Sequence, residues 1–173
     1  LRVLFVGNSY TQFHALPLVV RRVVQSIDPD ARIQVESVTH PGWDLARHWT
    51  FGEARRRIEH GHFTHVVLQG HSLSALRDPA ALRGAVGQFQ SVIGEAGART
   101  VLYETWARAE GADVYEEGLA TSPTEMQARI DRTYHELARS IGGTVARVGP
   151  AFLHVESMMP GEQLYQPDQS HPT

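Results

Sequence analysis

The first eleven residues, LRVLFVGNSYT (1–11), place a short apolar run directly before a turn of small and hydroxyl-bearing residues. An apolar run of this length that ends in a turn signal is typical of a buried strand. Ser9 follows Gly7 and Asn8 in the turn, so its hydroxyl group is expected at the carboxyl end of the strand. The same pattern also fits a serine that only caps the next helix, because serine is common at such positions.

Apolar runs and helical patterns alternate along the rest of the chain. Helices supply the long crossover connections that parallel strands need. The sequence therefore predicts an α/β fold, a three-layer α/β/α sandwich with a parallel sheet of about five strands. Residues 1–173 form a single domain in this interpretation, because no linker, internal repeat or low-complexity tract divides them. The predicted strands are 1–6, 33–38, 64–68, 100–103 and 144–148, and the predicted helices are 14–27, 45–59, 79–96 and 122–141.

The composition excludes several kinds of chemistry. The chain has 173 residues, 42% of them hydrophobic, and a net charge of −3, which gives no support to nucleic-acid binding. No apolar run is long enough to span a membrane. Cysteine is absent and all 16 basic residues are arginine, so cysteine nucleophiles, zinc–thiolate sites, Schiff bases and P-loop lysines are excluded. We expect a soluble protein, whose compartment and oligomeric state do not follow from the sequence.

The final loop of the chain holds Asp168 and His171, three residues apart. Residues at this spacing can lie on the same side of a turn, so that the carboxylate orients the imidazole ring while its other nitrogen faces a nucleophile. A serine needs such a base because its hydroxyl group is protonated at neutral pH. Catalytic groups of parallel sheets gather beyond the carboxyl ends of the strands, which is where Ser9 is expected. Taken alone, an Asp and a His in a surface loop also occur by chance.

Three blocks in order resemble the SGNH hydrolases, the GDSL-type esterase superfamily, and particularly its bacterial members that begin with GNSYT. FVGNSYT (5–11) is similar to the first block, with Asn8 where many members have Asp. PGWDL (41–45) is similar to the second block, and LYQPDQSHP (164–172) to the last. The resemblance spans nearly the whole chain.

This resemblance implies an SGNH/flavodoxin-like fold and a serine esterase that hydrolyses a carboxylic ester through an acyl-enzyme. Ser9, Asp168 and His171 are then the catalytic triad. The backbone N–H groups of Ser9 and Gly42 belong to the oxyanion hole, and no metal or cofactor is required. The family usually continues with a helix after its last block, whereas only Pro172 and Thr173 follow here, so we expect a domain that is missing its C-terminal helix.

The third block departs from the family pattern, which has G-x-N after the third strand with the Asn as an oxyanion donor. This chain has QGHS at 69–72. Counting from the strand end places His71 at the Asn position, and counting from Gly70 places Ser72 there. We prefer His71, because its ring N–H has a similar reach and a serine hydroxyl is shorter. Losing one such donor typically costs about 10²–10³ in rate.

The altered donor supports a second hypothesis, a catalytically impaired SGNH-like domain that binds a glycan or a protein partner. The presence of all three triad residues argues against it, because a binding module does not need them. A flavodoxin-like binding protein would explain the sheet but not the last block. Fold alone does not decide among these functions.

Trp43 and Trp106 are the candidate substrate-binding residues, since each follows a predicted strand and is expected at the rim of the site. Aromatic rims suit sugar rings and acyl chains, although core packing is the commoner role of Trp. Glu104, at the end of the fourth strand, is also expected to face the site. The expected substrate is a small-molecule ester, with a small acyl group on a carbohydrate or another polar alcohol. No metal site is predicted from the histidines at 60, 62 and 65, which lie where a helix ends and a strand begins.

Overall fold

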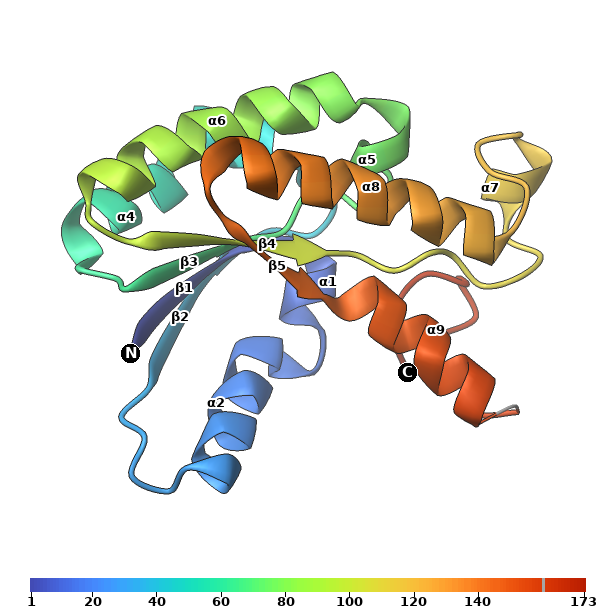
Figure 1. The fold of residues 1–173 in the computed structure, drawn as a ribbon, viewed down its shortest axis with the longest axis horizontal. Helices are drawn as coiled ribbons and strands as arrows, with labels where there is room; N and C mark the ends of the chain where they lie inside the picture. Colours follow the sequence, from blue (N-terminus) through green and yellow to red (C-terminus); the bar gives the residue numbers. More distant parts are fainter. Residues whose placement is uncertain (160) are drawn as a thin grey trace.

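A five-stranded parallel sheet organises the fold in the computed structural model, which describes residues 1–159 and 161–173 (Figure 1). The strand order is β2-β1-β3-β4-β5, so β1 lies inside the sheet between β2 and β3. Neighbouring strands pair in parallel throughout. The α/β fold with a parallel sheet of five strands is therefore confirmed. The strands are β1 (Arg2–Gly7), β2 (Gln34–Thr39), β3 (His65–Leu68), β4 (Arg99–Glu104) and β5 (Thr144–Arg147).

Helices flank the sheet on two faces (Figure 1). The upper face carries α3 (Leu45–Phe51), α4 (Glu53–Gly61), α5 (Ser74–Arg77), α6 (Pro79–Glu95) and α8 (Pro123–Ile141). The lower face carries α2 (Leu16–Ile27) and α9 (Val148–Met158). Shorter helices lie in the connections: α1 (Ser9–Gln12) and the 3-10 turn η1 (Phe13–Ala15) after β1, and α7 (Asp113–Glu116) between β4 and α8.

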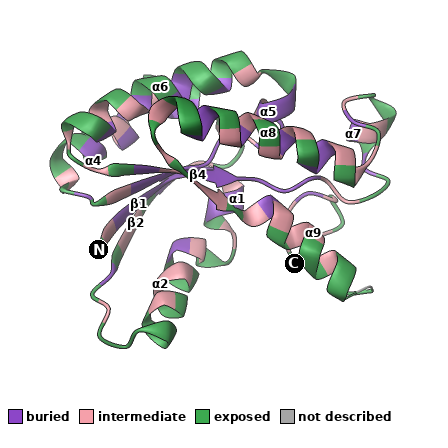
Figure 2. Ribbon diagram, in the orientation of Figure 1, coloured by how far each residue is buried: buried purple, intermediate pink, exposed green. Residues whose placement is uncertain are grey.

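Alternate strand residues divide the core between these faces. Leu4 and Val66 point to the upper face and pack in one cluster with Phe89 of α6 and Ile130 of α8, and all four are fully buried. Burying one such side chain contributes about 1.5–3 kcal/mol. Figure 2 shows buried residues along the strands and on α6 and α8, whose remaining residues are exposed or of intermediate burial. This packing fixes the strands, and the strands fix the loops that follow them.

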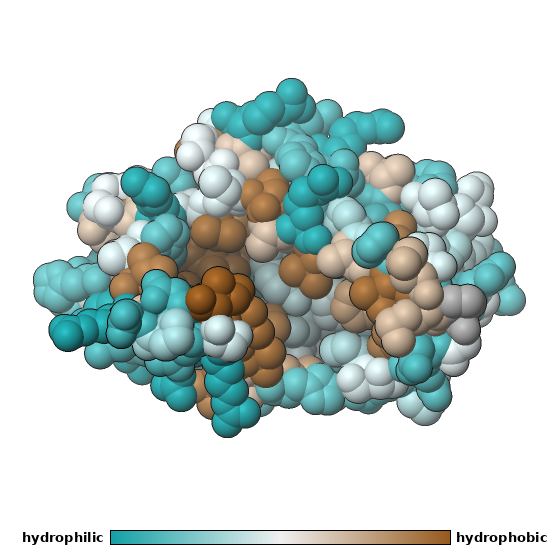
Figure 3. Space-filling model, turned by 60° about the horizontal axis from the view of Figure 1, so that its bottom comes forward, coloured by the Kyte–Doolittle hydropathy of each residue, from teal (hydrophilic) through white to brown (hydrophobic). Residues whose placement is uncertain are grey.

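The lower face carries an open apolar groove of about 400 Å³ beside α2. Hydrophobic side chains gather in a hollow on this side of the molecule (Figure 3). Its lining comes mainly from alternate residues of β1, β3 and β4, from Ala146 of β5 and from one side of α2. These residues include Val3 and Phe5 of β1, Val67 of β3, Val101 of β4, and Leu16, Val20 and Val24 of α2.

Two of the longer helical regions differ from the prediction, and the short helices α1, α5 and α7 were not predicted. The helix predicted over 45–59 is two helices, because Gly52 adopts a left-handed backbone (φ 81°) that ends α3. Helix α9 was not predicted, since the pair Gly149 and Pro150 resembles a turn. Pro150 lies in the first turn of α9, where its missing N–H needs no partner. Among the described residues, no helix has both the length and the apolar character that crossing a membrane requires.

Candidate active site

The turn after β1 presents Ser9 as the first residue of α1. Asn8 is the N-cap of this helix, and its side-chain oxygen accepts the backbone N–H of Tyr10 at 3.1 Å. The interpretation of Ser9 as merely a helix cap is therefore wrong. Asn8 Nδ2 also donates to the carbonyl oxygen of Trp43 at 3.0 Å, which ties this turn to the loop after β2. The Ser9 hydroxyl is left to interact elsewhere.

Buried side chains from two other segments hold this turn in place. Gln69 Oε1, just after β3, accepts the backbone N–H of Asn8 at 2.9 Å and the hydroxyl of Thr11 at 3.0 Å. Gly7 passes so close that a Cβ atom there would lie 2.5 Å from both Gln69 Oε1 and Thr11 Oγ1. His48 of α3 donates from Nε2 to the Gly7 carbonyl at 2.8 Å, and burial lowers the pKa of its ring. The position of Ser9 is thus set by neighbours in space that lie far away in sequence.

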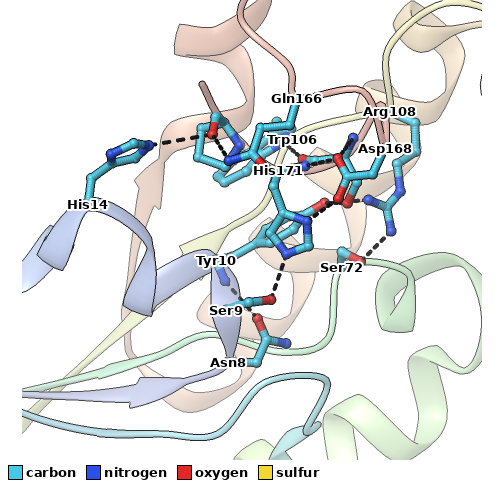
Figure 4. Close-up of polar contacts among 12 residues, drawn as sticks. Asn8, Ser9, Tyr10, His14, Ser72, Trp106, Arg108, Gln166, Asp168 and His171 are labelled. Carbon is cyan, nitrogen blue, oxygen red and sulfur yellow. Dashed lines mark hydrogen bonds and ion pairs between the residues drawn. The ribbon is translucent and has the colours of Figure 1, made fainter.

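Ser9, His171 and Asp168 form a continuous hydrogen-bonded chain (Figure 4). His171 Nε2 lies 2.8 Å from Ser9 Oγ, and His171 Nδ1 is hydrogen-bonded to Asp168 Oδ2. Asp168 Oδ1 accepts the backbone N–H groups of Ser170 at 3.0 Å and of His171 at 2.9 Å. Burial acts to raise the pKa of Asp168, but the hydrogen bonds from His171 and the backbone outweigh it, so this pKa lies below its usual value. The charged carboxylate therefore holds a proton on Nδ1 and leaves Nε2 free to accept the proton of Ser9.

The loop that carries Asp168 and His171 is tightly turned. Gln169, between them, has a left-handed backbone with φ 56°, which is uncommon for a residue with a side chain. The His171 ring packs against Phe13, with ring centroids 4.8 Å apart, and meets the edge of Tyr10 at 5.3 Å. These contacts fix the orientation of the ring beside Ser9.

Ser9 and His171 open onto a cavity of about 680 Å³, a size that suits a small-molecule ligand. The cavity collects residues from the loops at the carboxyl ends of the strands. Its lining consists of Asn8, Ser9, Tyr10, Gln12, Phe13, Pro41, Gly42, His71, Ser72, Arg108, Ser170 and His171.

Several cavity residues carry N–H groups that have no acceptor within residues 1–159 and 161–173, and three of these groups match the donors expected for an oxyanion hole. Two are the backbone N–H groups of Ser9 and Gly42. The third belongs to His71, whose Nδ1 accepts the backbone N–H of Leu73 at 3.3 Å, so the neutral ring carries its proton on Nε2. Burial, and then the nearby Arg108, lower the pKa of His71, which keeps the ring neutral. An oxygen that gains negative charge in the cavity has these three donors available to it.

Ser72, the other candidate for the third donor, also lines the cavity, and Arg108 fixes its hydroxyl oxygen. Ser72 Oγ accepts a hydrogen bond from Arg108 Nη2 at 2.8 Å. Accepting this bond leaves the Ser72 hydroxyl proton free to donate, so Ser72 stays the alternative. We keep His71 as the proposed donor because its ring N–H has the longer reach.

Comparison with solved structures identifies the fold. A protein from Slackia heliotrinireducens, described as an SGNH hydrolase candidate, superposes with a TM-score of 0.84 at 22% identity, over 100% of this chain and 90% of that one. The SGNH hydrolase fold is the fold of this chain. An acetyl xylan esterase has a TM-score of 0.75 at 13% identity, over 100% of this chain and 92% of its own. An acetylxylan esterase from Geobacillus stearothermophilus, solved as a catalytic mutant, has a TM-score of 0.70 at 14% identity, over 99% and 86%. No family model matches the sequence, and no curated protein matches it.

The two tryptophans lie differently from the expectation. Trp106 is buried, with 2% of its surface exposed, so the prediction that it lies at the rim of the site is corrected. Its ring is stacked between Tyr10 at 4.2 Å and Phe152 at 4.4 Å, and its Nε1 donates to the Ser170 carbonyl. Trp43 is half-buried and stacks on His40 beside the cavity, without lining it. Trp106 therefore supports the floor of the site from the core.

Glu104 does not face the cavity as expected. It is buried, and Oε1 accepts from Gln127 of α8 at 2.8 Å, while burial raises the pKa of its carboxyl to about 7. In the part of the chain that the structure describes, Glu104, Asp131 and His135 are the group whose ligand atoms lie close enough for a metal ion, within 4.8 Å of one another. Arg147 lies 3.4 Å from Asp131 and already supplies positive charge there. The histidines at 60, 62 and 65 do not belong to this group.

Sequence reasoning missed Arg108, which lies in the loop after β4 and lines the cavity. Its Nη1 donates to the Tyr10 hydroxyl at 2.7 Å and its Nη2 donates to Ser72. The Tyr10 hydroxyl in turn lies 2.7 Å from Ser170 Oγ, so one network joins the loops after β1, β3, β4 and α9 (Figure 4). A charged residue in a loop after a strand was the available signal, because such loops meet at one edge of the sheet.

Proposed function

We propose that this protein is a serine esterase in which Ser9 is the nucleophile, His171 the general base and acid, and Asp168 the residue that orients His171. The observation that carries the proposal is the hydrogen-bonded chain from Asp168 through His171 to Ser9, open to a cavity. A serine hydroxyl becomes an effective nucleophile only beside a base held in this way.

The proposed reaction follows from the positions of these atoms. As Ser9 Oγ attacks the acyl carbon, its proton moves to His171 Nε2, and Asp168 stabilises the imidazolium that results. The oxygen of the tetrahedral intermediate accepts hydrogen bonds from the N–H groups of Ser9 and Gly42 and from His71 Nε2. His171 then donates its proton to the leaving alcohol, and an ester on Ser9 remains. Water attacks this acyl-enzyme with His171 again as the base, which releases the acid. The steps require no metal ion or cofactor.

The proposed substrate is a small-molecule ester with a small acyl group on a carbohydrate or another polar alcohol. Two of the superposed proteins are named as acetyl xylan esterases, which supports this class. The cavity also offers polar contacts to an alcohol, from Gln12, Ser72 and Arg108. Trp106 is buried and offers no contact to the substrate.

The proposal is tested by measuring hydrolysis of p-nitrophenyl acetate by the wild type, Ser9→Ala and Ser91→Ala. Ser91 is exposed on α6, so it provides the same chemical change away from the cavity. We expect Ser9→Ala to lower kcat/KM by about 10⁴-fold or more, with Ser91→Ala unchanged. Equal rates in Ser9→Ala and the wild type would exclude the proposed mechanism.

Covalent labelling distinguishes the serine esterase from the second hypothesis, a catalytically impaired domain that binds a glycan or protein. A fluorophosphonate reacts with an activated serine, and intact-mass measurement reports the adduct. We expect one adduct on the wild type and none on Ser9→Ala. Absence of both labelling and hydrolysis would favour the binding function.

A further inference from the structure

Arg108 is built into the cavity wall by two hydrogen bonds that fix its guanidinium group. Nη1 donates to the hydroxyl of Tyr10 and Nη2 donates to Ser72 (Figure 4). Tyr10 is itself held by stacking on the buried Trp106. A guanidinium fixed in this way loses little conformational freedom when a ligand binds.

The positive charge of Arg108 is not neutralised by its partners. Burial raises the pKa of the Tyr10 phenol even though Arg108 lowers it in part, so this hydroxyl is neutral, as is that of Ser72. No carboxylate among the described residues lies within 4.0 Å of the Arg108 guanidinium. Arg77, a nearby arginine outside the cavity, is instead paired with Glu117 at 2.7 Å. A half-buried charge without a counterion destabilises the protein unless a ligand supplies the opposite charge.

Three of the five N–H donors of the Arg108 guanidinium have no acceptor among the described residues. Other cavity side chains are neutral or belong to the proposed catalytic machinery, so Arg108 is the fixed charge that a substrate meets there. The planar donor geometry of a guanidinium matches a carboxylate, and hydrogen bonds between charged partners are roughly twice as strong as neutral ones.

We propose that Arg108 forms an anion subsite, and that the preferred esters carry a carboxylate in either their acyl or their alcohol part. This inference rests on the proposed esterase function and narrows its substrate class. Arg108 acts in it as a specificity-determining residue, which holds the substrate while Ser9 attacks the neighbouring ester carbon.

Matched pairs of esters test the subsite. In the acyl arm, mono-p-nitrophenyl succinate is compared with p-nitrophenyl acetate. In the alcohol arm, 4-acetoxybenzoate is compared with its methyl ester. The variants are Arg108→Gln, Arg108→Lys and, as the matched control, Arg77→Gln. The measured quantity is the ratio of kcat/KM for the anionic ester to that for its neutral partner.

We expect the wild type to favour the anionic ester in one arm by about tenfold or more, which identifies the part of the substrate that carries the charge. Arg108→Gln is expected to remove this preference, Arg108→Lys to keep part of it, and Arg77→Gln to leave it unchanged. Added salt should reduce the preference. A wild type without preference in both arms overturns the proposal. An equal loss on charged and neutral esters in Arg108→Gln also overturns it, because the residue then only positions Tyr10 and Ser72.

A binding measurement separates failure of the subsite from failure of the esterase. Calorimetry with Ser9→Ala, which need not turn over, compares monomethyl succinate with dimethyl succinate. We expect binding of the monoanion, and its loss in the double variant Ser9→Ala/Arg108→Gln. This result would support the subsite even if the wild type hydrolysed no ester. The same comparison is made for 4-acetoxybenzoate and its methyl ester, which carry the charge in the alcohol part. No preference for the anion in either pair would contradict the subsite whatever the fate of the esterase proposal.

Discussion

The cavity beside Ser9 and the groove under the sheet differ in where their lining residues come from. The cavity is lined by loop residues that follow different strands, such as Ser9, His71 and Arg108. The groove is lined by alternate residues within the strands and by α2, including Val67 and Val20. The first brings polar hydrogens and charge together, whereas the second exposes aliphatic side chains.

This difference shows how an α/β sheet separates stability from chemistry. Strand residues are held by packing, and any side chain of similar shape and hydrophobicity serves there. Loop residues at the strand ends are held by individual hydrogen bonds, and the arrangement depends on each atom. Substitutions in the cavity should therefore change activity more than stability, and substitutions in the core and groove should do the reverse.

Replacing His171 should give the largest effect. We expect His171→Asn to lower kcat/KM on p-nitrophenyl acetate by about 10⁴-fold, because Ser9 loses the group that accepts its proton. His154→Asn, the same change at an exposed position of α9 on the lower face, should leave the rate unchanged. Urea titration should give similar free energies of unfolding for both variants. If His171→Asn and His154→Asn lost the same factor in rate, substitutions in the cavity and on the lower face would not differ in their effect on activity.

Replacing His71 should have the next largest effect, about 10²–10³-fold in kcat, as expected for one oxyanion donor. The sign of its pH dependence follows from the pKa of the ring, which burial and Arg108 lower. His71 therefore stays neutral from mildly acidic to alkaline pH, and its Nε2–H is available throughout. The loss in His71→Ala should be the same factor at each pH from 6.5 to 9. A larger loss in Ser72→Ala would instead assign the third donor to Ser72.

Much of this arrangement could be predicted from the sequence, because its signals are local. Apolar runs that end in turns located all five strands, and their alternation with helices fixed the parallel sheet. The spacing of Asp168 and His171 was sufficient to expect contact between them, and the order of the blocks linked them to Ser9. These inferences depend on the order of the elements along the chain and on the spacing of apolar residues, both of which can be read from the sequence.

The remaining features depend on neighbours in space. Gln69 reaches back to Asn8, and Arg108 crosses to Tyr10 and Ser72, so their roles appear only when the loops are brought together. Trp106 was placed at the rim because it follows a strand, but its direction toward the core depends on stacking with Phe152 of α9, a helix that was not predicted. Local patterns do not contain that information.

Gly7→Ala should affect stability and activity together, because this position couples the core to the site. The added Cβ would lie 2.5 Å from Gln69 Oε1 and Thr11 Oγ1, so either these buried side chains, which hold the turn that carries Ser9, or the turn itself must shift. We expect a loss of about 1–3 kcal/mol in the free energy of unfolding, with a fall in kcat. Gly87→Ala on α6 is the matched control, since nothing lies within 4 Å of its added Cβ. It should be neutral or stabilise the protein by up to about 1 kcal/mol. A normal rate in Gly7→Ala would show that the turn tolerates movement.

The smallest effect on activity is expected from a pair of neighbours on β3 that face opposite sides of the sheet. Val66 is fully buried under α6 and α8, whereas Val67, with 8% exposed, borders the groove. Truncating Val66 to Ala removes two buried methyl groups and leaves a closed cavity, so we expect a loss of about 2–3 kcal/mol. Val67→Ala only widens an existing hollow and should cost about 1 kcal/mol, with kcat/KM unchanged in both variants. Urea titration measures the difference. If Val67→Ala proved as costly as Val66→Ala, the groove would be covered in solution, because only a packed partner on that face would make the two positions equivalent.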